Sequence, residues 1–242
     1  MKKIINYILI GLLAITAFVS CSDYYDDGGL TSTEPMKINT LEFLKSKPEL
    51  FDTTLIILEK TGLDKVIASE NVTFFAPQKK SILNALASIN KFVVKNQHNK
   101  DSLGYTRDTV MIDDVPVEAW KKYMSRYIFK GQHFRDDFKK GKFLTEGTKS
   151  WINGGDYLQS YGSYDMFLLT EWTTWESVAE AGPHYIHLID GKGTDLTSSA
   201  KAKYTSIRVL TSNLRTTSGV VHVLEKTHEF GFNSSGNFIP AK

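Results

Sequence analysis

The chain has 242 residues, of which 29 are lysine or arginine and 27 are aspartate or glutamate. Residues 1–20 contain two of those lysines and no acidic residue, so the remainder carries 27 side chains of each sign. A formally neutral chain without a block of like charge gives no electrostatic support for nucleic-acid binding. The single cysteine excludes an internal disulfide, and the length suffices for one large core or two small ones.

Residues 1–20 have the pattern of a secretory signal peptide. Lys2 and Lys3 form a positive start, and the apolar run Ile4–Val19 is shorter than the ~20 residues that a membrane-spanning helix needs. The run ends at Phe18-Val19-Ser20-Cys21, which resembles the bacterial lipobox, although leucine is usual in place of Phe18. The resemblance implies cleavage after Ser20 and lipidation of Cys21, which would then anchor the protein to a membrane.

Residues 21–37 are polar and acidic and are predicted to form a flexible tether. Asp23, Asp26 and Asp27 precede Gly28-Gly29, a pattern that resembles the signal sending some lipoproteins of diderm bacteria to the outer face. The same residues fit a solvated acidic linker, and the two interpretations are compatible. We expect a lipid-anchored protein of the outer membrane that faces the cell exterior.

Apolar spacing and terminal signals predict helical segments in the first half of the remaining chain. These segments begin at Thr40, Pro48, Leu63, Lys79 and Pro116. Thr40 is expected to cap the first, Gly62 is expected to end the second, and the fourth is predicted to run to Ile89.

Strands are predicted to dominate from about residue 142 onward, where glycines punctuate the chain. Val72–Ala76 is predicted as an early buried strand, and Val220–Leu224 as a late one. The polar residues 95–115 are predicted to form a surface excursion. Helices first and strands last indicate an α+β fold with a mainly antiparallel sheet.

Three segments resemble, in order, the conserved blocks of the fasciclin (FAS1) domain. They are Leu55–Pro77 with its ending Val-Thr-Phe-Phe-Ala-Pro, Trp120–Gly131, and Thr211–Glu225 with its Val-Val-His-Val strand. The resemblance implies a single fasciclin-like domain over residues 38–232, with helices packed on a mainly antiparallel β-wedge or sandwich. It implies an elaborated region at about 155–205, a C-terminal tail at 233–242, and a non-enzymatic adhesion module.

Two departures from the family pattern matter. Tyr127-Ile128 stands where the family usually has a Tyr-His pair, so the integrin-type adhesion linked with that pair is not implied. Ser218-Gly219 stands where Asn-Gly is usual, and Gly219 can still supply the positive φ that such a turn requires.

The histidines are not expected to form a metal site. His184 and His187 are three residues apart, near Asp190, but such positions on a strand point to opposite faces. His222 lies in an apolar strand and is predicted to be a partly buried, hydrogen-bonded histidine. No metal or other cofactor is expected.

The acidic residues likewise give no enzyme motif. The pairs Asp113-Asp114 and Asp136-Asp137 lie beside turns or helix starts, where capping or solvation explains them. Glu171 and Glu176 lie near two tryptophans, which leaves a glycoside-active hydrolase as a remote alternative. The chain is therefore expected not to be an enzyme.

Aromatic residues are concentrated in the elaborated region. They are Tyr157, Tyr161, Tyr164, Trp172 and Trp175. Exposed aromatic rings stack on sugars and also anchor protein interfaces, whereas buried ones form cores. We expect some of these side chains to line a ligand-binding surface, although core packing explains the pattern as well.

Three short motifs resemble the Asp-Ser/Thr-apolar acceptor for O-glycosylation in some diderm bacteria. The candidate acceptors are Ser102, Thr109 and Thr53. Two of them lie in the polar excursion, where a modifying enzyme could reach them.

Together these features predict a surface-anchored, non-enzymatic binding or adhesion module. Its concrete form is an accessory lipoprotein that captures glycan for an outer-membrane uptake system. The alternative is a structural adhesion protein that acts through protein–protein contacts. The expected partners are the membrane, through the lipid anchor, and a glycan or an outer-membrane or surface protein.

Overall fold

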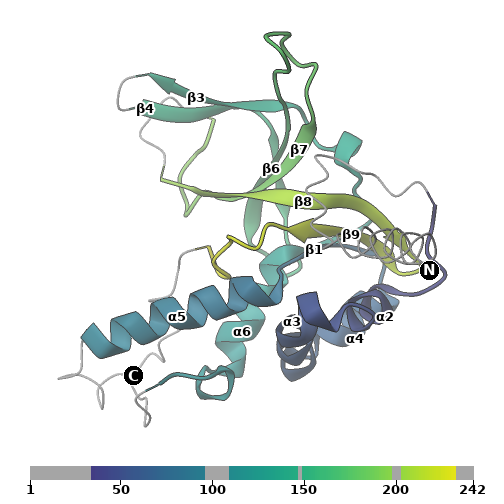
Figure 1. Cartoon of the computed structure of the whole chain (residues 1–242), viewed down its shortest axis with the longest axis vertical. Helices are drawn as coiled ribbons and strands as arrows, with labels where there is room; N and C mark the ends of the chain where they lie inside the picture. The colour runs from purple at the N-terminus through teal and green to yellow at the C-terminus, as the bar shows by residue number, and fades with distance from the viewer. Residues whose placement is uncertain (1–33, 96–108, 147–148, 198–202, 233–242) are drawn as a thin grey trace, which may run out of the picture.

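The computed structural model describes residues 34–95, 109–146, 149–197 and 203–232 (Figure 1). The signal peptide, Cys21, most of the tether, Ser102 and the C-terminal tail lie outside these residues. Within the described ranges, no helix is both long and apolar enough to cross a membrane.

The helices cluster on one side of the molecule (Figure 1). They are α2 (Thr40–Lys45), α3 (Pro48–Thr61), α4 (Leu63–Ser69), α5 (Lys79–Lys95) and α6 (Val117–Met124), with the short 3₁₀ turns η4 (Ile112–Asp114), η5 (Ser125–Tyr127) and η6 (Arg135–Asp137). All five predicted helical segments are present. The fourth extends beyond its predicted end at Ile89, and the Asn90 side chain donates to the Val110 carbonyl at 3.1 Å and accepts from the Val110 N–H at 2.6 Å.

The helix ends follow local chemistry, with one correction. Pro48 occupies the first turn of α3, and Gly62 ends that helix with a φ of 71°, as predicted. The cap of α2 is Asn39, not Thr40: the Asn39 Oδ1 accepts from the Glu42 N–H at 2.9 Å, and Glu42 reciprocates at 3.0 Å. Thr40 is instead buried, and its hydroxyl lies 2.8 Å from that of Thr216.

Seven strands form one sheet in the order β2-β1-β9-β8-β7-β6-β5. Their bounds are β1 Val72–Ala76, β2 Ile128–Lys130, β5 Asp156–Gln159, β6 Asp165–Trp172, β7 His184–Asp190, β8 Thr205–Thr216 and β9 Gly219–Leu224. All neighbours are antiparallel except β1 and β9, which pair in parallel. The strands β3 (Gly141–Glu146) and β4 (Lys149–Gly154) form a separate hairpin.

The sheet nearly closes on itself. Just after the edge strand β5, the Tyr161 N–H donates to the Ile128 carbonyl of the opposite edge strand at 2.7 Å. Such closure protects both edges from pairing with other chains. The α+β class and the mainly antiparallel sheet are confirmed, but the sheet is one nearly closed wedge and not a sandwich.

The main core fills the space between helices and sheet and is rich in aromatic rings. Tyr127 stacks on Phe230 and Phe232 at centroid distances of 5.3 and 5.2 Å, and Trp120 packs on Phe230 at 5.6 Å. A smaller cluster around Phe167 and Leu169 lies under the β3–β4 hairpin. Segments from both ends of the domain therefore meet in one core.

Replacing Gly219 by alanine tests the turn between β8 and β9. Gly219 has a φ of 151°, and a Cβ there would lie 1.8 Å from the Val72 carbonyl oxygen. Because backbone on the neighbouring strand must move, Gly219→Ala should lower the free energy of unfolding by more than about 3 kcal/mol, measured by denaturant titration.

Gly193→Ala is the matched control for this prediction. Gly193 also has a positive φ, 77°, but nothing lies within 4 Å of its added Cβ. The expected loss is only about 1 kcal/mol, from the left-handed backbone alone. Equal effects at the two glycines would contradict the proposed clash.

Candidate functional site

The segment between β6 and β7, residues 173–183, projects beyond the sheet at the top of Figure 1; we call it the arm. Its base is closed by backbone and side-chain bonds. The Thr173 hydroxyl donates to the Pro183 carbonyl at 2.8 Å, and the Gly182 N–H donates to the Thr173 carbonyl at 2.9 Å. Gly182 is required there, because a Cβ would lie 2.4 Å from the Thr173 hydroxyl.

The apex of the arm is a two-residue hairpin turn. Trp175 and Val178 exchange both backbone hydrogen bonds, at 3.0 and 2.7 Å. The two residues between them, Glu176 and Ser177, have φ values of 45° and 67°. Turns of this type usually contain Asn-Gly, and non-glycine residues in the left-handed region cost about 1 kcal/mol each or more. The apex is therefore a strained backbone conformation.

The apex presents two apolar side chains to solvent. Trp175 and Val178 are each 59% exposed, the highest values among the large apolar side chains of the described residues. Directly opposed residues of an antiparallel pair point to the same face, so the two side chains lie side by side. We call this pair the apex pair.

Trp172, at the base of the arm, is partly covered by two side chains. The His184 ring stacks on it at 4.2 Å with an interplanar angle of 8°, and the Lys140 Nζ lies over the ring at 4.4 Å from its centroid. Trp172 is 38% exposed, less than Trp175.

Salt bridges fasten the arm to the β3–β4 hairpin. Glu180, which has a φ of 64°, pairs with Lys140 and, at 3.5 Å, with Lys142. The pairing with Lys140 is the main cause that lowers the pKa of the Glu180 carboxyl. Lys140 thus contacts both the arm and Trp172.

The five predicted aromatics do not form one surface. Tyr164 precedes β6 and Trp172 ends it, so about 27 Å of extended strand separates them. The Tyr161 hydroxyl donates to Glu70 at 3.1 Å, and Tyr157, 41% exposed, accepts from the Leu196 N–H at 3.2 Å. Only Trp175 leaves most of its side chain exposed.

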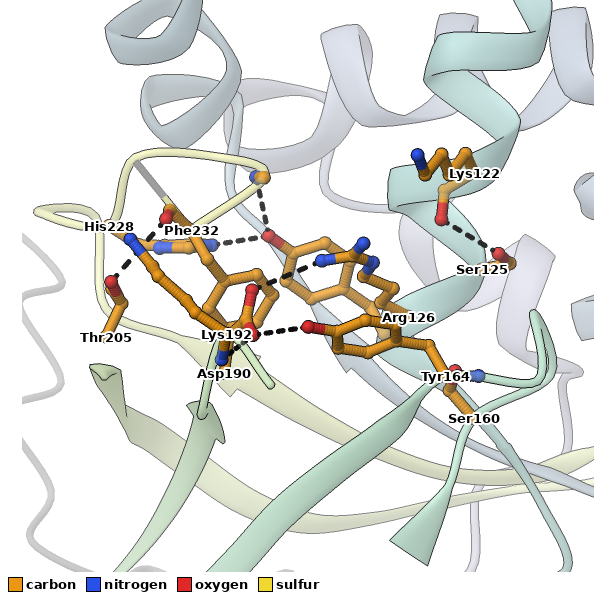
Figure 2. Close-up of polar contacts among 12 residues, drawn as sticks. Lys122, Ser125, Arg126, Ser160, Tyr164, Asp190, Lys192, Thr205, His228 and Phe232 are labelled. Atoms are coloured by element: carbon orange, nitrogen blue, oxygen red, sulfur yellow. Dashed lines mark hydrogen bonds and ion pairs between the residues drawn. The ribbon is translucent and has the colours of Figure 1, made fainter. Parts of the chain in front are cut away.

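Tyr164 belongs to a buried polar cluster between η5, the start of β6 and the end of β7 (Figure 2). Arg126 Nη1 donates to Asp190 Oδ2 at 3.2 Å, with side chains that are 9% and 1% exposed. The other Asp190 oxygen accepts from the Tyr164 hydroxyl and the Lys192 N–H, both at 2.8 Å. The guanidinium lies 3.6 Å from the Tyr164 ring centroid. Burial, then the bond to Asp190, raises the pKa of Tyr164 to about 12.

Two histidines are buried beside this cluster and in the sheet. The Asn213 N–H donates to His222 Nδ1 at 3.3 Å, so Nε2 carries the proton and donates to the His133 carbonyl at 2.9 Å. The predicted hydrogen-bonded histidine is confirmed, and it is completely buried. His228 Nε2 bonds the Tyr127 hydroxyl at 2.7 Å. Burial lowers the pKa of His222 to about 4 and that of His228 to about 3.

His184, His187 and Glu171, which were considered for a metal or catalytic site, each contact another side chain of the fold. His184 contacts Trp172 while His187 bonds Glu171 at 3.0 Å, so the two histidines lie on opposite faces of β7. The bond to His187 lowers the pKa of Glu171, which is the wrong direction for a general acid. No group of three metal-binding side chains occurs among the described residues.

The paired aspartates cap turns, in agreement with the prediction. Asp114 Oδ2 accepts from the Met111 N–H at 2.9 Å, and Asp137 Oδ2 accepts from the Phe134 N–H at 2.7 Å. Each second aspartate therefore satisfies a backbone donor at the start of a 3₁₀ turn.

The candidate glycosylation acceptors differ in exposure. Thr109 is exposed. Thr53 is 5% exposed within α3, and its hydroxyl donates to Asp52 at 2.8 Å. A glycan could reach Thr53 only before α3 packs.

Sequence reasoning missed two residues of the arm, Val178 and Glu180, and also Lys140, which pairs with Glu180. The apex turn lacks the glycine or asparagine that signals a hairpin, and Lys140 lies some thirty positions earlier in the chain. The spacing of Trp175 and Val178 around a two-residue turn was the only local signal.

No family model matches the chain, and no curated protein matches it at a significant level. Among solved structures, it is similar to a FAS1 domain pair from the insect cell adhesion molecule fasciclin I. The sequences are 14% identical and the TM-score is 0.42. The match covers 78% of this chain and 50% of the other, so the chain spans half the length of that protein.

Asp190→Ala tests the buried ion pair. The substitution leaves the Arg126 guanidinium buried without its counter-ion, so the free energy of unfolding should fall by about 3–5 kcal/mol. Asp156→Ala is the control, because its pair with Lys139 lies at the surface and should contribute little. If both variants lost a similar amount of free energy of unfolding in denaturant titration, the buried pair of Arg126 would contribute no more than a surface pair.

Acid should destabilise the domain through His222 and His228. Their pKa values of about 4 and 3 lie below the unfolded value near 6.5, so the unfolded state binds more protons. Stability is complete above pH 6.5 and falls as the pH drops toward 4. Between pH 7.5 and 5 each histidine should cost about 2 kcal/mol.

The check is denaturant unfolding of the wild type, His222→Gln and His228→Gln at both pH values. At pH 7.5, each variant is expected to have a lower free energy of unfolding than the wild type. On acidification to pH 5, its free energy of unfolding should fall by about 2 kcal/mol less than that of the wild type. An unchanged pH dependence in both variants would contradict the assignment.

Proposed function

We propose that this chain is an exported, lipid-anchored, non-enzymatic binding module with a fasciclin-like fold, held at the outer membrane and facing the exterior. The lipobox ending in Cys21 and the acidic tether after it support the anchor and its placement. The three sequence blocks and the α+β architecture support the fold.

The apex pair is the observation that carries a binding role. A protein that needs only to be soluble has no use for two large apolar side chains at the tip of a projecting arm. Both are held on a strained turn, and the arm is fastened through Glu180. Strain kept in an exposed segment is typical of functional sites.

A non-enzymatic role fits the hydrogen-bond partners of the titratable groups. Among the described residues, Glu171 is bonded to His187, Asp190 to Arg126, and His222 to backbone groups. Glu176 lies at the apex, five residues after Glu171, whereas Glu171 lies within β6 and bonds His187 on β7. The hydrolase alternative therefore has no support in this geometry.

Two ligand classes follow from the apex. Glycan capture for an outer-membrane uptake system is supported by the exposed ring of Trp175, because aromatic faces stack on sugars. Adhesion through protein contacts is supported by Val178 beside it, because apolar pairs anchor protein interfaces.

Trp175→Ala tests the binding role in the full-length, lipidated chain on intact cells. Removing an aromatic anchor should weaken binding of the cells to polysaccharide-coated or cell-coated surfaces by about 30-fold or more. Ile56→Ala is the control, since Ile56 is 43% exposed on α3, away from the arm. Binding by the Trp175 variant at the wild-type level would refute the role of the apex.

Cys21→Ala tests the anchor and its location. The unlipidated protein should leave the membrane fraction, whereas the wild-type domain should be digested by protease added to intact cells. A wild-type domain that is fully protected from protease would place it on the inner side of the outer membrane.

A further inference from the structure

We infer that the apex pair docks into an apolar pocket of a protein partner, and that this pocket is bordered by basic side chains. This inference rests on the proposed binding role and names the class of ligand for the same site. Four features of the arm carry it.

The first feature is shape. The apex projects from the sheet, and two surface hollows among the described residues lie elsewhere. One is lined by Leu50, Lys79 and Lys226, and the other by Thr205, Glu225 and His228. Small ligands bind in hollows, whereas a projecting aromatic side chain enters a hollow on its partner. The geometry therefore places the cavity on the partner.

The second feature is the apolar surroundings of Trp175. Trp172 would be the natural second platform for a sugar chain, but the His184 ring stacks on it and the Lys140 Nζ lies over its ring. Trp175 stands beside Val178, which has no hydrogen-bonding group. Sugar hydroxyls placed against valine would lose water without gaining a partner. The apex pair is thus suited to an apolar protein surface.

The third feature is preorganisation. The turn at Glu176 and Ser177 and the bonds at Thr173 order the arm before any partner arrives, and the surface salt bridges of Glu180 add a small contribution. A segment ordered in advance loses less conformational entropy on binding. The strain of the turn is consistent with a shape selected for contact and not for stability.

The fourth feature is charge. Glu180 pairs with two lysines, so the side of the arm carries one excess positive charge, whereas Glu176 is exposed at the tip of the turn. The apex turn itself therefore presents the negative charge of Glu176 next to its apolar pair. A partner pocket bordered by lysine or arginine complements this charge and sets the orientation of docking.

The experiment places a photoreactive phenylalanine analogue at position 175 of the full-length, lipidated chain in intact cells. The matched control carries the same group at position 56, where Ile56 is similarly exposed. Illumination is expected to give one discrete adduct, at position 175 only. The adduct should be removed by protease and unchanged by periodate oxidation of sugars. Adding Val178→Asp or Glu176→Lys to the position-175 chain should reduce its yield at least tenfold.

The other possible results of this experiment contradict the inference, the proposed binding role, or both. A periodate-sensitive adduct, an adduct to lipid, or a cross-linked dimer of this chain would overturn the protein-pocket inference. The binding role of the apex would still stand if Trp175→Ala weakens binding. No adduct at position 175, together with full binding by Trp175→Ala, would overturn both. If Glu176→Lys left the adduct yield unchanged, the inferred basic side chains around the partner pocket would be contradicted.

Discussion

Arg126 and Asp190, 64 residues apart in the chain, meet in an ion pair that excludes almost all solvent. Such a pair is costly to desolvate, and it is much more costly to break once formed. It therefore fixes how the end of α6 sits on β7 and on the start of β6. The bond from Tyr161 to Ile128 that closes the sheet lies two to three residues from members of this cluster. Ion pair and sheet closure thus hold the same corner of the molecule.

That fixed corner gives β6 and β7 two unlike ends. At one end, Tyr164 and Asp190 are held by buried hydrogen bonds and by the Arg126 guanidinium. At the other end, the same two strands continue into the arm, where positive φ values and exposed apolar side chains occur. The free energy gained in the packed corner is what allows a strained segment to persist at the distal end. The packed corner and the exposed arm therefore lie at opposite ends of the same two strands, β6 and β7.

Three buried titratable groups have structural hydrogen-bond partners. The buried histidines remain neutral, with pKa values of about 4 and 3, and the tyrosine beside Asp190 remains protonated. Each is tied to the fold by hydrogen bonds to neighbouring groups. In the proposed function, the lipid anchor would set where the protein is held and the arm would make the contact.

Local rules were enough to predict several features from the sequence. Pro48 and Gly62 bound α3, the second aspartate of each pair caps a turn, and His222 is hydrogen-bonded within its strand, because each depends on residues close in the chain. Local rules misplaced the α2 cap by one residue, since Asn39 and Thr40 are both good caps and the burial of Thr40 against Thr216 decided between them. Other features depend on which distant segments meet in the fold. They are the parallel pairing of β1 with β9, the separation of the aromatics along β6, the stacking of His184 on Trp172 and the burial of Thr53. Composition and spacing do not contain those contacts. The sequence by itself therefore determined that aromatics are concentrated between residues 157 and 175, and only the tertiary structure decided that Trp175 and Val178 are the most exposed apolar side chains of the described residues.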